Sequence, residues 1–168
     1  MARILILGGG CRGLALASEM LAEGHAVRIT TRTEDGRAAI EATGSECWIG
    51  TPDRLSTLRG ALDSVTVLCW LLGSAEGSAE ELRSLHGTRL EYLLTQAIDT
   101  TVRGFLYESS APARTATLVQ DGERRARTLL DLNSIPAVFV RAELTDRSGW
   151  LAEARAGVHA LLGGQAPA

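Results

Sequence analysis

The sequence predicts a doubly wound α/β domain, in which helices cover both faces of a parallel sheet. Three observations predict it. Short apolar runs alternate with amphipathic segments of helical length, a glycine-rich turn directly follows the first run, and the run at residues 65–72 is apolar or β-branched throughout. A continuously apolar strand is typical of a parallel sheet, because helices bury both of its faces.

The same alternation sets the expected element boundaries. We expect six strands in the spatial order 3-2-1-4-5-6, at residues 4–7, 26–30, 46–49, 65–72, 102–108 and 137–141. Helices are expected between them, at residues 14–23, 35–43, 51–62, 78–99, 123–132 and 150–162. Thr51 is the expected N-cap of the third helix, and Ser78 with Glu81 forms a capping box for the fourth. Residues 113–122 have weak periodicity and are expected to form a mobile loop.

Length and composition restrict the possible functions. The 168 residues suffice for one domain, which we place at residues 1–164 with a disordered tail at 165–168. A net charge of -3 gives no reason to expect nucleic acid or an anionic membrane as a partner. The three cysteines are isolated and odd in number, so neither a disulfide framework nor a metal site is indicated. We expect no signal peptide and no membrane span, and therefore a cytoplasmic protein.

The glycine turn is the strongest functional signal. Gly8, Gly10 and Gly13 stand in G-x-G-x-x-G spacing between a strand and a helix, which is the context of a dinucleotide-binding turn. Gly8 would permit the tight turn, Gly10 the approach of a pyrophosphate, and Gly13 close packing of the helix on the sheet. The N–H groups of the helix's first turn would point at the phosphates. Cys11 is interpreted as a small residue facing the cofactor.

The end of the second strand favours NADP(H) over NAD(H). An NAD site usually has an acid about 20 residues past the glycines, but this chain has Thr31 and Arg32 there. Arg32, together with Arg12 in the glycine turn, could hold a 2′-phosphate. The alternative stays open, because Glu34 and Asp35 follow closely and a shift of two residues would restore an acid.

A ligand of such a sheet lies outside the carboxyl ends of the strands, where the strand order reverses. The remaining expected cofactor-binding residues all occupy strand ends that meet there: Thr51, Leu71, Leu72 and Ser109.

Several stretches resemble the short-chain dehydrogenase/reductase superfamily, particularly its extended and atypical branches of epimerase/dehydratase-like proteins. They are VRITTRT in the second strand, GSECWIGTPDRLSTLRGALDSVTVLCWLL from the third strand to the fourth, HGTRLEYLL at residues 86–94 and FLYESSAP at residues 105–112. The resemblance covers residues 3–142. It implies a Rossmann fold and NAD(P) binding, and it places Ser110 at the position of the family's catalytic Ser or Thr, with Ser109 beside it.

The departures from the family pattern concern chemistry. Thr51 stands where the family usually has an Asp that contacts adenine. The family's reductases also use a Tyr-x-x-x-Lys pair, in which the Lys lowers the Tyr pKa. All 17 basic residues here are Arg, and the segment GERRARTLL has no Tyr. No room remains for the substrate-binding lobe of the extended members.

Three functions therefore remain open: an NADP(H)-binding protein without the standard catalytic pair, an NADPH-dependent oxidoreductase or epimerase acting on a small molecule, or an interaction module that has lost its ligand. Tyr107 is assigned to packing, and the three histidines are assigned to surface or helix positions. We also expect a homodimer, because the closing helix is unusually apolar at Trp150, Leu151, Val158 and Leu161.

Overall fold

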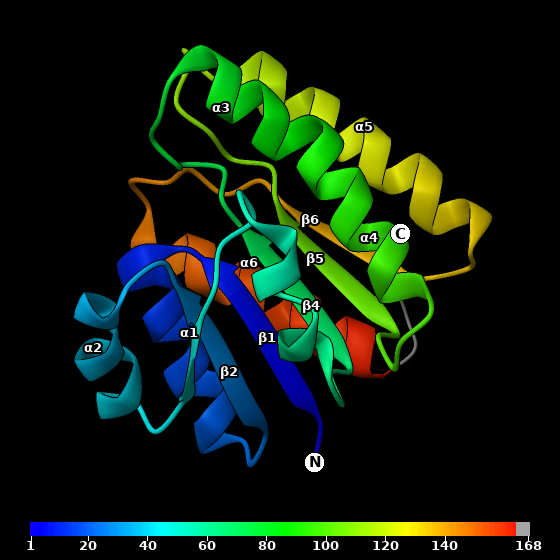
Figure 1. Ribbon diagram of the computed structural model, residues 1–168. Helices are drawn as coiled ribbons and strands as arrows, with labels where there is room; N and C mark the ends of the chain where they lie inside the picture. The colour runs from blue at the N-terminus through cyan, green and yellow to red at the C-terminus, as the bar shows by residue number, and fades with distance from the viewer. Residues whose placement is uncertain (164–168) are drawn as a thin grey trace.

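Six parallel strands form a single sheet in the computed structural model, which describes residues 1–163 (Figure 1). The spatial order is β3-β2-β1-β4-β5-β6, so the predicted doubly wound topology is confirmed. The order reverses between β1 and β4. The strands are β1 (Arg3–Gly8), β2 (Ala26–Thr31), β3 (Glu46–Ile49), β4 (Val67–Leu71), β5 (Gly104–Glu108) and β6 (Ala137–Val140).

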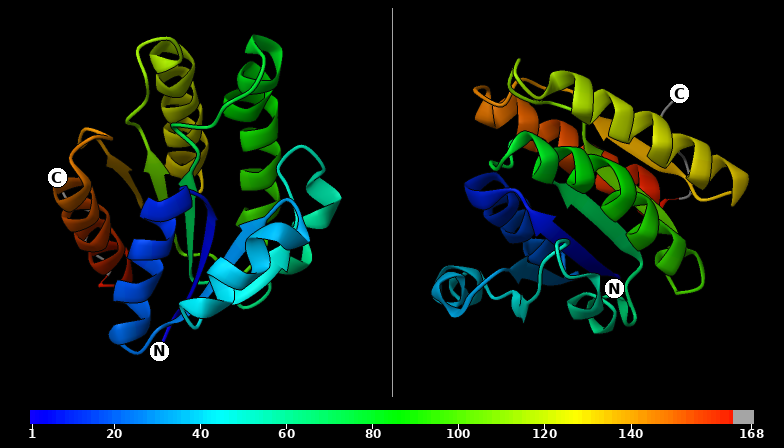
Figure 2. Two further views of the ribbon diagram at one scale, coloured as in Figure 1. Left: turned by 90° about the vertical axis from the view of Figure 1, so that its left-hand side faces the viewer. Right: turned by 45° about the horizontal axis from the view of Figure 1, so that its top comes forward.

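Each face of the sheet has its own hydrophobic core, because alternate residues of a strand point to opposite faces. In β1, Leu5 and Leu7 belong to one core, and Ile4 and Ile6 belong to the other. The Ile4 side is covered by α1 (Gly10–Ala22), α2 (Arg37–Ala42) and α6 (Arg147–Leu162). The Leu5 side is covered by α3 (Ala79–Ser84), α4 (Leu90–Ile98) and α5 (Ala116–Leu132), and Figure 2 shows the resulting three layers.

The predicted helix at residues 51–62 is wrong. Two single 3₁₀ turns stand there instead, Leu55–Thr57 and Gly60–Leu62. The carbonyl oxygen of Arg54, which a helix would use, accepts instead from the hydroxyl (2.6 Å) and the N–H (2.9 Å) of Thr57. At the end of this stretch, Nη1 of the buried Arg28 in β2 donates to the carbonyl oxygens of Ala61 (2.5 Å) and Asp63 (3.3 Å). Thr51 consequently caps no helix.

The predicted helix at 78–99 is present but interrupted. Ser78 and Glu81 form the expected capping box at its start. At Leu85–Arg89 the chain makes one wider π turn, inside which Gly87 has non-helical dihedral angles (φ -119°, ψ -107°). The turn directs His86 into the interior, where it is 3% exposed. The assignment of His86 to a helix holds, but the side chain is buried.

The mobile loop predicted at residues 113–122 is largely helix, since α5 begins at Ala116. Its buried stripe consists of Val119, Gly122, Ala126 and Leu130. Two of these four residues are small, so the apolar periodicity that would reveal the helix is weak. Gly122 is required, because a Cβ there would lie 2.3 Å from the Tyr107 hydroxyl oxygen.

Helix α6 does not offer the interface expected from its apolar residues. Trp150 and Val158 are fully buried and Leu161 is 6% exposed, all in the core of this chain. The apolar excess is explained by packing within one chain, and it gives no support to a homodimer. The tail predicted at 165–168 lies outside the described residues.

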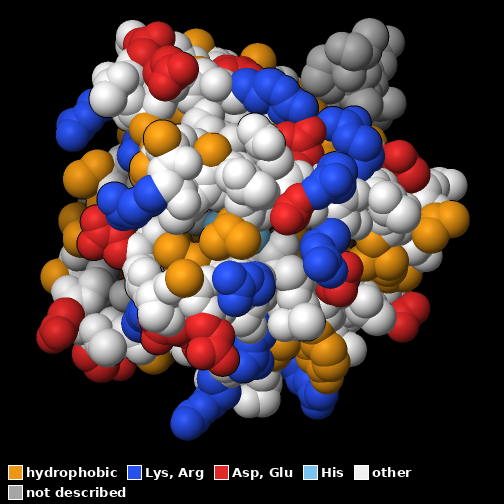
Figure 3. Space-filling model, turned by 90° about the horizontal axis from the view of Figure 1, so that it is seen from above, with side chains coloured by type: hydrophobic (Ala, Val, Ile, Leu, Met, Phe, Trp, Pro, Cys, Tyr) orange, Lys and Arg blue, Asp and Glu red, His pale blue; other side chains and the backbone are white. Residues whose placement is uncertain are grey.

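The described surface carries charges of both signs. On the face shown in Figure 3, Arg side chains and acidic side chains lie intermixed. Within residues 1–163, no helix combines the length and the apolar character needed to span a membrane. The same residues contain no group of three or more His, Cys, Asp or Glu that could hold a metal ion.

Candidate functional site

The glycine turn joins β1 to α1 at the point where the strand order reverses. Gly8, Gly9 and Gly10 all have positive φ, and Gly9 is the N-cap of α1. A Cβ at Gly13 would lie 2.6 Å from the carbonyl oxygen of Gly8, so only glycine fits where the helix meets the strand. A Cβ at Gly10 would meet no atom within 4 Å. The backbone at Gly10 is therefore open to a ligand.

The start of α1 also supplies hydrogen-bond donors. The first N–H groups of an α-helix have no acceptor within the helix, and they carry the positive end of its dipole. Here the N–H groups of Arg12 and Gly13 bond the carbonyl oxygen of Gly9 (3.0 and 3.1 Å). Those of Gly10 and Cys11 lie on an exposed stretch of the chain. This is the arrangement that binds phosphate groups in other dinucleotide folds.

A cavity of about 200 Å³ opens on the β2 side of the turn. It lies at the carboxyl ends of β1 and β2, and the β3 loop and the end of β4 close it. Its lining residues are Leu7, Gly8, Thr30, Thr31, Arg32, Gly50, Pro52, Leu72 and Leu85. Five of the expected cofactor residues thus surround one space or border it closely: Gly8, Thr31, Arg32, Leu72 and, next to Gly50, Thr51. Leu71 is different, because it is buried in the core on the α1 side.

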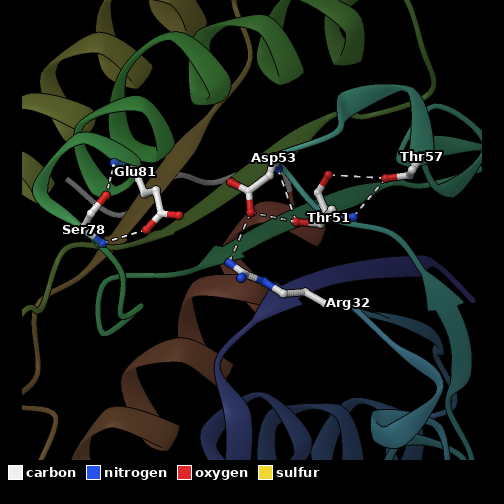
Figure 4. A network of polar contacts seen from close by, with 6 residues as sticks. All are labelled: Arg32, Thr51, Asp53, Thr57, Ser78 and Glu81. Atoms are coloured by element: carbon white, nitrogen blue, oxygen red, sulfur yellow. Dashed lines mark hydrogen bonds and ion pairs between the residues drawn. The ribbon is translucent and has the colours of Figure 1, made fainter.

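Arg32 reaches across this cavity to an acid that the sequence did not single out. Its Nη2 lies 3.4 Å from Oδ2 of Asp53, in the loop after β3 (Figure 4). Both side chains are more than half exposed. On the other side, Glu81 at the start of α3 is held by the Ser78 N–H at 2.7 Å. The Ser78 bonds lower the pKa of Glu81, and the charge of Arg32 lowers it further.

Arg12 does not join Arg32. Its Nη2 donates to Ser74 Oγ at 2.7 Å, and its Nε lies 3.4 Å from Oε2 of Glu108 at the end of β5. The guanidinium group also lies 5.6 Å from the centre of the Trp150 ring. The two arginines are therefore held by different partners, and the structure does not bring them together as a joint site for one 2′-phosphate.

Glu108 is a buried carboxylate that sequence reasoning missed. It is fully buried, and its Oε1 has no hydrogen-bond partner among residues 1–163. Burial raises the pKa of Glu108, while the charge of Arg12 and the nearby backbone N–H groups of Gly73 and Ser74 oppose that rise. The available signal was its position, an acid at the carboxyl end of an apolar strand and directly before the two serines.

A second cavity, of about 300 Å³, lies on the α6 side of the glycine turn. It is lined by Cys11, Arg12, Ala15, Arg147, Ser148, Trp150 and Leu151. Cys11 is exposed there, whereas the thiol of Cys69 is fully buried and burial raises its pKa to about 12.

The two serines after β5 differ. The Ser110 hydroxyl donates to the carbonyl oxygen of Ala142, and so ties this loop to the segment after β6. The Ser109 hydroxyl is buried without a partner among the described residues. It borders a third, polar cavity of about 540 Å³, which is also lined by Thr117, Gln120, Asp121, Glu123, Arg124 and Arg141. Of the two hydroxyl groups, that of Ser109 is the one without a bond to backbone.

Tyr107 is fully buried, as its assignment to packing implies. Its hydroxyl lies 2.8 Å from His86 Nδ1 and 3.0 Å from the carbonyl oxygen of Val119. Burial raises the pKa of Tyr107 and lowers that of His86 to about 4. Both rings are therefore uncharged near neutral pH, and they link α5 to the wide turn between α3 and α4.

Comparison with known proteins shows which solved structures share this fold. No family profile matches the sequence, and no curated protein matches it significantly. Solved structures do match. The protein gox2253 has a TM-score of 0.71 at 19% identity, over 84% of this chain and 51% of its own. A short-chain dehydrogenase/reductase superfamily protein from Agrobacterium tumefaciens with bound NAD has a TM-score of 0.67 at 21% identity, over 83% and 48%.

The triphenylmethane reductase of Citrobacter sp., complexed with NADP(H), has a TM-score of 0.63 at 19% identity, over 83% of this chain and 48% of its own. This chain thus spans about half the length of these proteins. At such identities the likeness concerns the fold. The chain shares the Rossmann-type α/β fold of these structures.

Proposed function

We propose that the chain binds a dinucleotide at the glycine turn, with NADP(H) preferred over NAD(H). The observation that carries the proposal is the open backbone of Gly10 at the start of α1, directly beside a cavity that bears Arg32. The pyrophosphate would bind the N–H groups at Gly10 and Cys11. The adenosine half would occupy the cavity between β2 and β3, and Arg32 would bind the 2′-phosphate.

The structural relatives agree with this proposal without deciding the cofactor. One of them is complexed with NADP(H) and another holds NAD. Arg32 is the feature of this chain that favours the phosphorylated form, since a planar guanidinium group can bind a phosphate with two hydrogen bonds. Arg12 has no part in that preference, because Ser74 and Glu108 hold it elsewhere.

A titration with NADPH, NADH, NADP⁺ and NAD⁺, followed by calorimetry, tests the proposal. We expect NADPH to bind the wild-type protein more tightly than NADH does. Arg32→Ala should weaken NADPH binding and leave NADH binding unchanged. Arg37→Ala is the matched control, because Arg37 lies five residues away and pairs with Glu34 and Glu41 outside the cavity. If none of the four nucleotides binds, the proposal fails and an interaction module is the remaining function.

A second candidate function is an NADPH-dependent oxidoreductase or epimerase acting on a small molecule. The unpartnered Ser109 hydroxyl beside a polar cavity favours it. When bound, the nicotinamide would supply hydride transfer. The chain has no Tyr-x-x-x-Lys pair, so the Ser109 hydroxyl would rotate into the cavity to bind the reacting oxygen, and water would move the proton.

The serine variants separate a catalytic role from a structural one. Under the second candidate function, Ser109→Ala should abolish turnover and keep NADPH binding. Ser110 is the residue that the family resemblance marks as catalytic. Ser110→Ala should mainly lower stability, because the Ser110 hydroxyl bonds the loop after β6. If both variants lose turnover equally and keep their stability, the result would favour Ser110 as the catalytic residue.

A further inference from the structure

The ion pair between Arg32 and Asp53 connects two segments on opposite sides of the adenosine cavity. Arg32 follows β2, Asp53 follows β3, and the two charged groups are 3.4 Å apart. Arg32 is also the residue that would bind a 2′-phosphate. The same guanidinium group therefore has two possible anionic partners, one from the protein and one from the ligand.

A fixed turn positions Asp53. Its N–H donates to Thr51 Oγ1 at 3.3 Å, and the Thr51 N–H donates to Thr57 Oγ1 at 2.9 Å. The Thr57 hydroxyl in turn donates to the carbonyl oxygen of Arg54 at 2.6 Å. Figure 4 shows this chain of contacts leading to Arg32. The carboxylate is thus placed by backbone geometry, and Asp53 cannot swing far from Arg32 on its short side chain.

Glu81 adds a second negative charge near Arg32. Its carboxylate is fixed in the capping box with Ser78, on the α3 side of the cavity (Figure 4). Arg32 between two carboxylates leaves this end of the cavity with a net negative charge. A 2′-phosphate adds between one and two further negative charges. Its binding must therefore compete with Asp53 for Arg32 and act against the repulsion of both acids.

We propose that Asp53 is a specificity-determining residue, which limits the preference for NADP(H) by occupying the guanidinium group of Arg32. This proposal rests on the proposed function. Asp53 is the more important of the two acids because it contacts Arg32 directly, whereas the Glu81 carboxylate is already bound by the Ser78 N–H. The ribose of NAD(H) carries no phosphate, so its binding does not require the pair to open.

Asp53→Asn tests the proposal, because asparagine keeps the size of the side chain and removes its charge. The expected result is NADPH binding about two- to fivefold tighter, as for a surface ion pair, with NADH binding changed less than twofold. In the Arg32→Ala background the gain for NADPH should shrink to the smaller part that comes from relieved repulsion, and NADH binding should stay unchanged. High salt should reduce the gain, since screening weakens exposed charge interactions.

Glu34→Gln is the matched control. Glu34 lies two residues from Arg32, but its carboxylate is bound by Arg37 at 2.6 and 3.0 Å. The Glu34→Gln substitution should leave the ratio of the NADPH and NADH affinities unchanged. The proposal is overturned if Asp53→Asn weakens NADH binding and leaves NADPH binding unchanged, because Asp53 would then bind the ribose hydroxyls itself. It is also overturned if the full gain persists without Arg32. Absence of binding by every variant and by the wild type would instead refute the proposed function.

Discussion

Replacing Arg12 with Met leaves the buried carboxylate of Glu108 without its opposite charge. Glu108 is fully buried, and the Arg12 side chain beside it is 19% exposed. Loss of Arg12 raises the pKa of Glu108 further, so that the folded variant keeps the proton on Glu108 up to a higher pH than the wild type does. The variant can avoid a buried, unpaired charge by protonating Glu108. The free energy of that protonation is therefore the upper limit of the destabilisation caused by losing the charge pair.

The limit follows from linkage between protonation and folding. Each pH unit above the pKa of the unfolded chain costs about 1.4 kcal/mol for one proton. With the ordinary glutamate pKa of 4.5, the cost is at most about 3.4 kcal/mol at pH 7 and about 0.7 kcal/mol at pH 5. The sign is set by the raised pKa, because the folded state then binds the proton more tightly than the unfolded state. The variant therefore loses stability as the pH rises from 4.5 toward the pKa of the folded state.

Urea unfolding followed by circular dichroism at pH 5, 6, 7 and 8 measures this dependence. The difference in unfolding free energy between wild type and Arg12→Met should grow with pH. Compared with the Glu108→Gln single variant, the Arg12→Met/Glu108→Gln double variant should show no pH-dependent loss, and only a constant loss from the Ser74 bond and the Trp150 contact should remain. An equal loss at pH 5 and pH 8, or a slope that persists in the double variant, would refute the reasoning.

Three further predictions concern the turn and the buried tyrosine. Gly10→Ala should cost about 1–2 kcal/mol for its positive φ of 49° and abolish NADPH binding, because the new methyl group occupies the open side of the turn; unchanged binding by calorimetry would refute the assigned pyrophosphate position. Tyr107→Phe should cost about 1–3 kcal/mol by removing the partner of His86, with no change in NADPH affinity; a change in affinity would contradict a purely structural role. Gly122→Ala should cost about 1–3 kcal/mol through its clash with the Tyr107 hydroxyl. The double variant should then lose less in urea unfolding than the sum of the single losses, and additive losses would count against that clash.

The strands and their order could be predicted because their signals are local. Four to eight apolar residues bounded by glycine or polar residues are enough to identify a buried strand. Ile4, Leu5 and Ile6 are all fully buried, as a strand covered on both faces requires. The glycine turn after them then fixes where the first helix begins, and topology follows from the alternation of elements.

The wrong assignments have long-range causes. The sequence at 51–62 begins like a helix, with Thr51 and Pro52, yet the chain forms two 3₁₀ turns there, and Arg28 from a neighbouring strand binds its end. The start of α5 is hidden because Gly122 and Ala126 replace large apolar residues where the helix approaches Tyr107. The local sequence pattern of these two segments identifies neither Arg28 nor Tyr107 as a partner.

The candidate site was predictable in its spacing and not in its charges. Gly10 and Arg32 lie where the motif places them, at the turn and at the neighbouring cavity. The direction of Arg12 depends on Glu108, which lies 96 residues away in the chain. Asp53 reaches Arg32 only because residues 51–57 fold into a tight loop and not into a helix.

The wide turn at Leu85–Arg89 makes the length of this segment more important than its composition. The buried residues Leu85 and Leu90 are five positions apart, and the extra residue is accommodated in the π turn. Deleting one residue of the turn would restore regular helix and leave the residues beyond it on the same face. Leu90, Leu93 and Leu94 would then still fill the core, whereas His86 would lose the wide turn that directs it inward. The inward direction of His86 thus depends on one additional residue, which a comparison of side-chain types alone would not reveal.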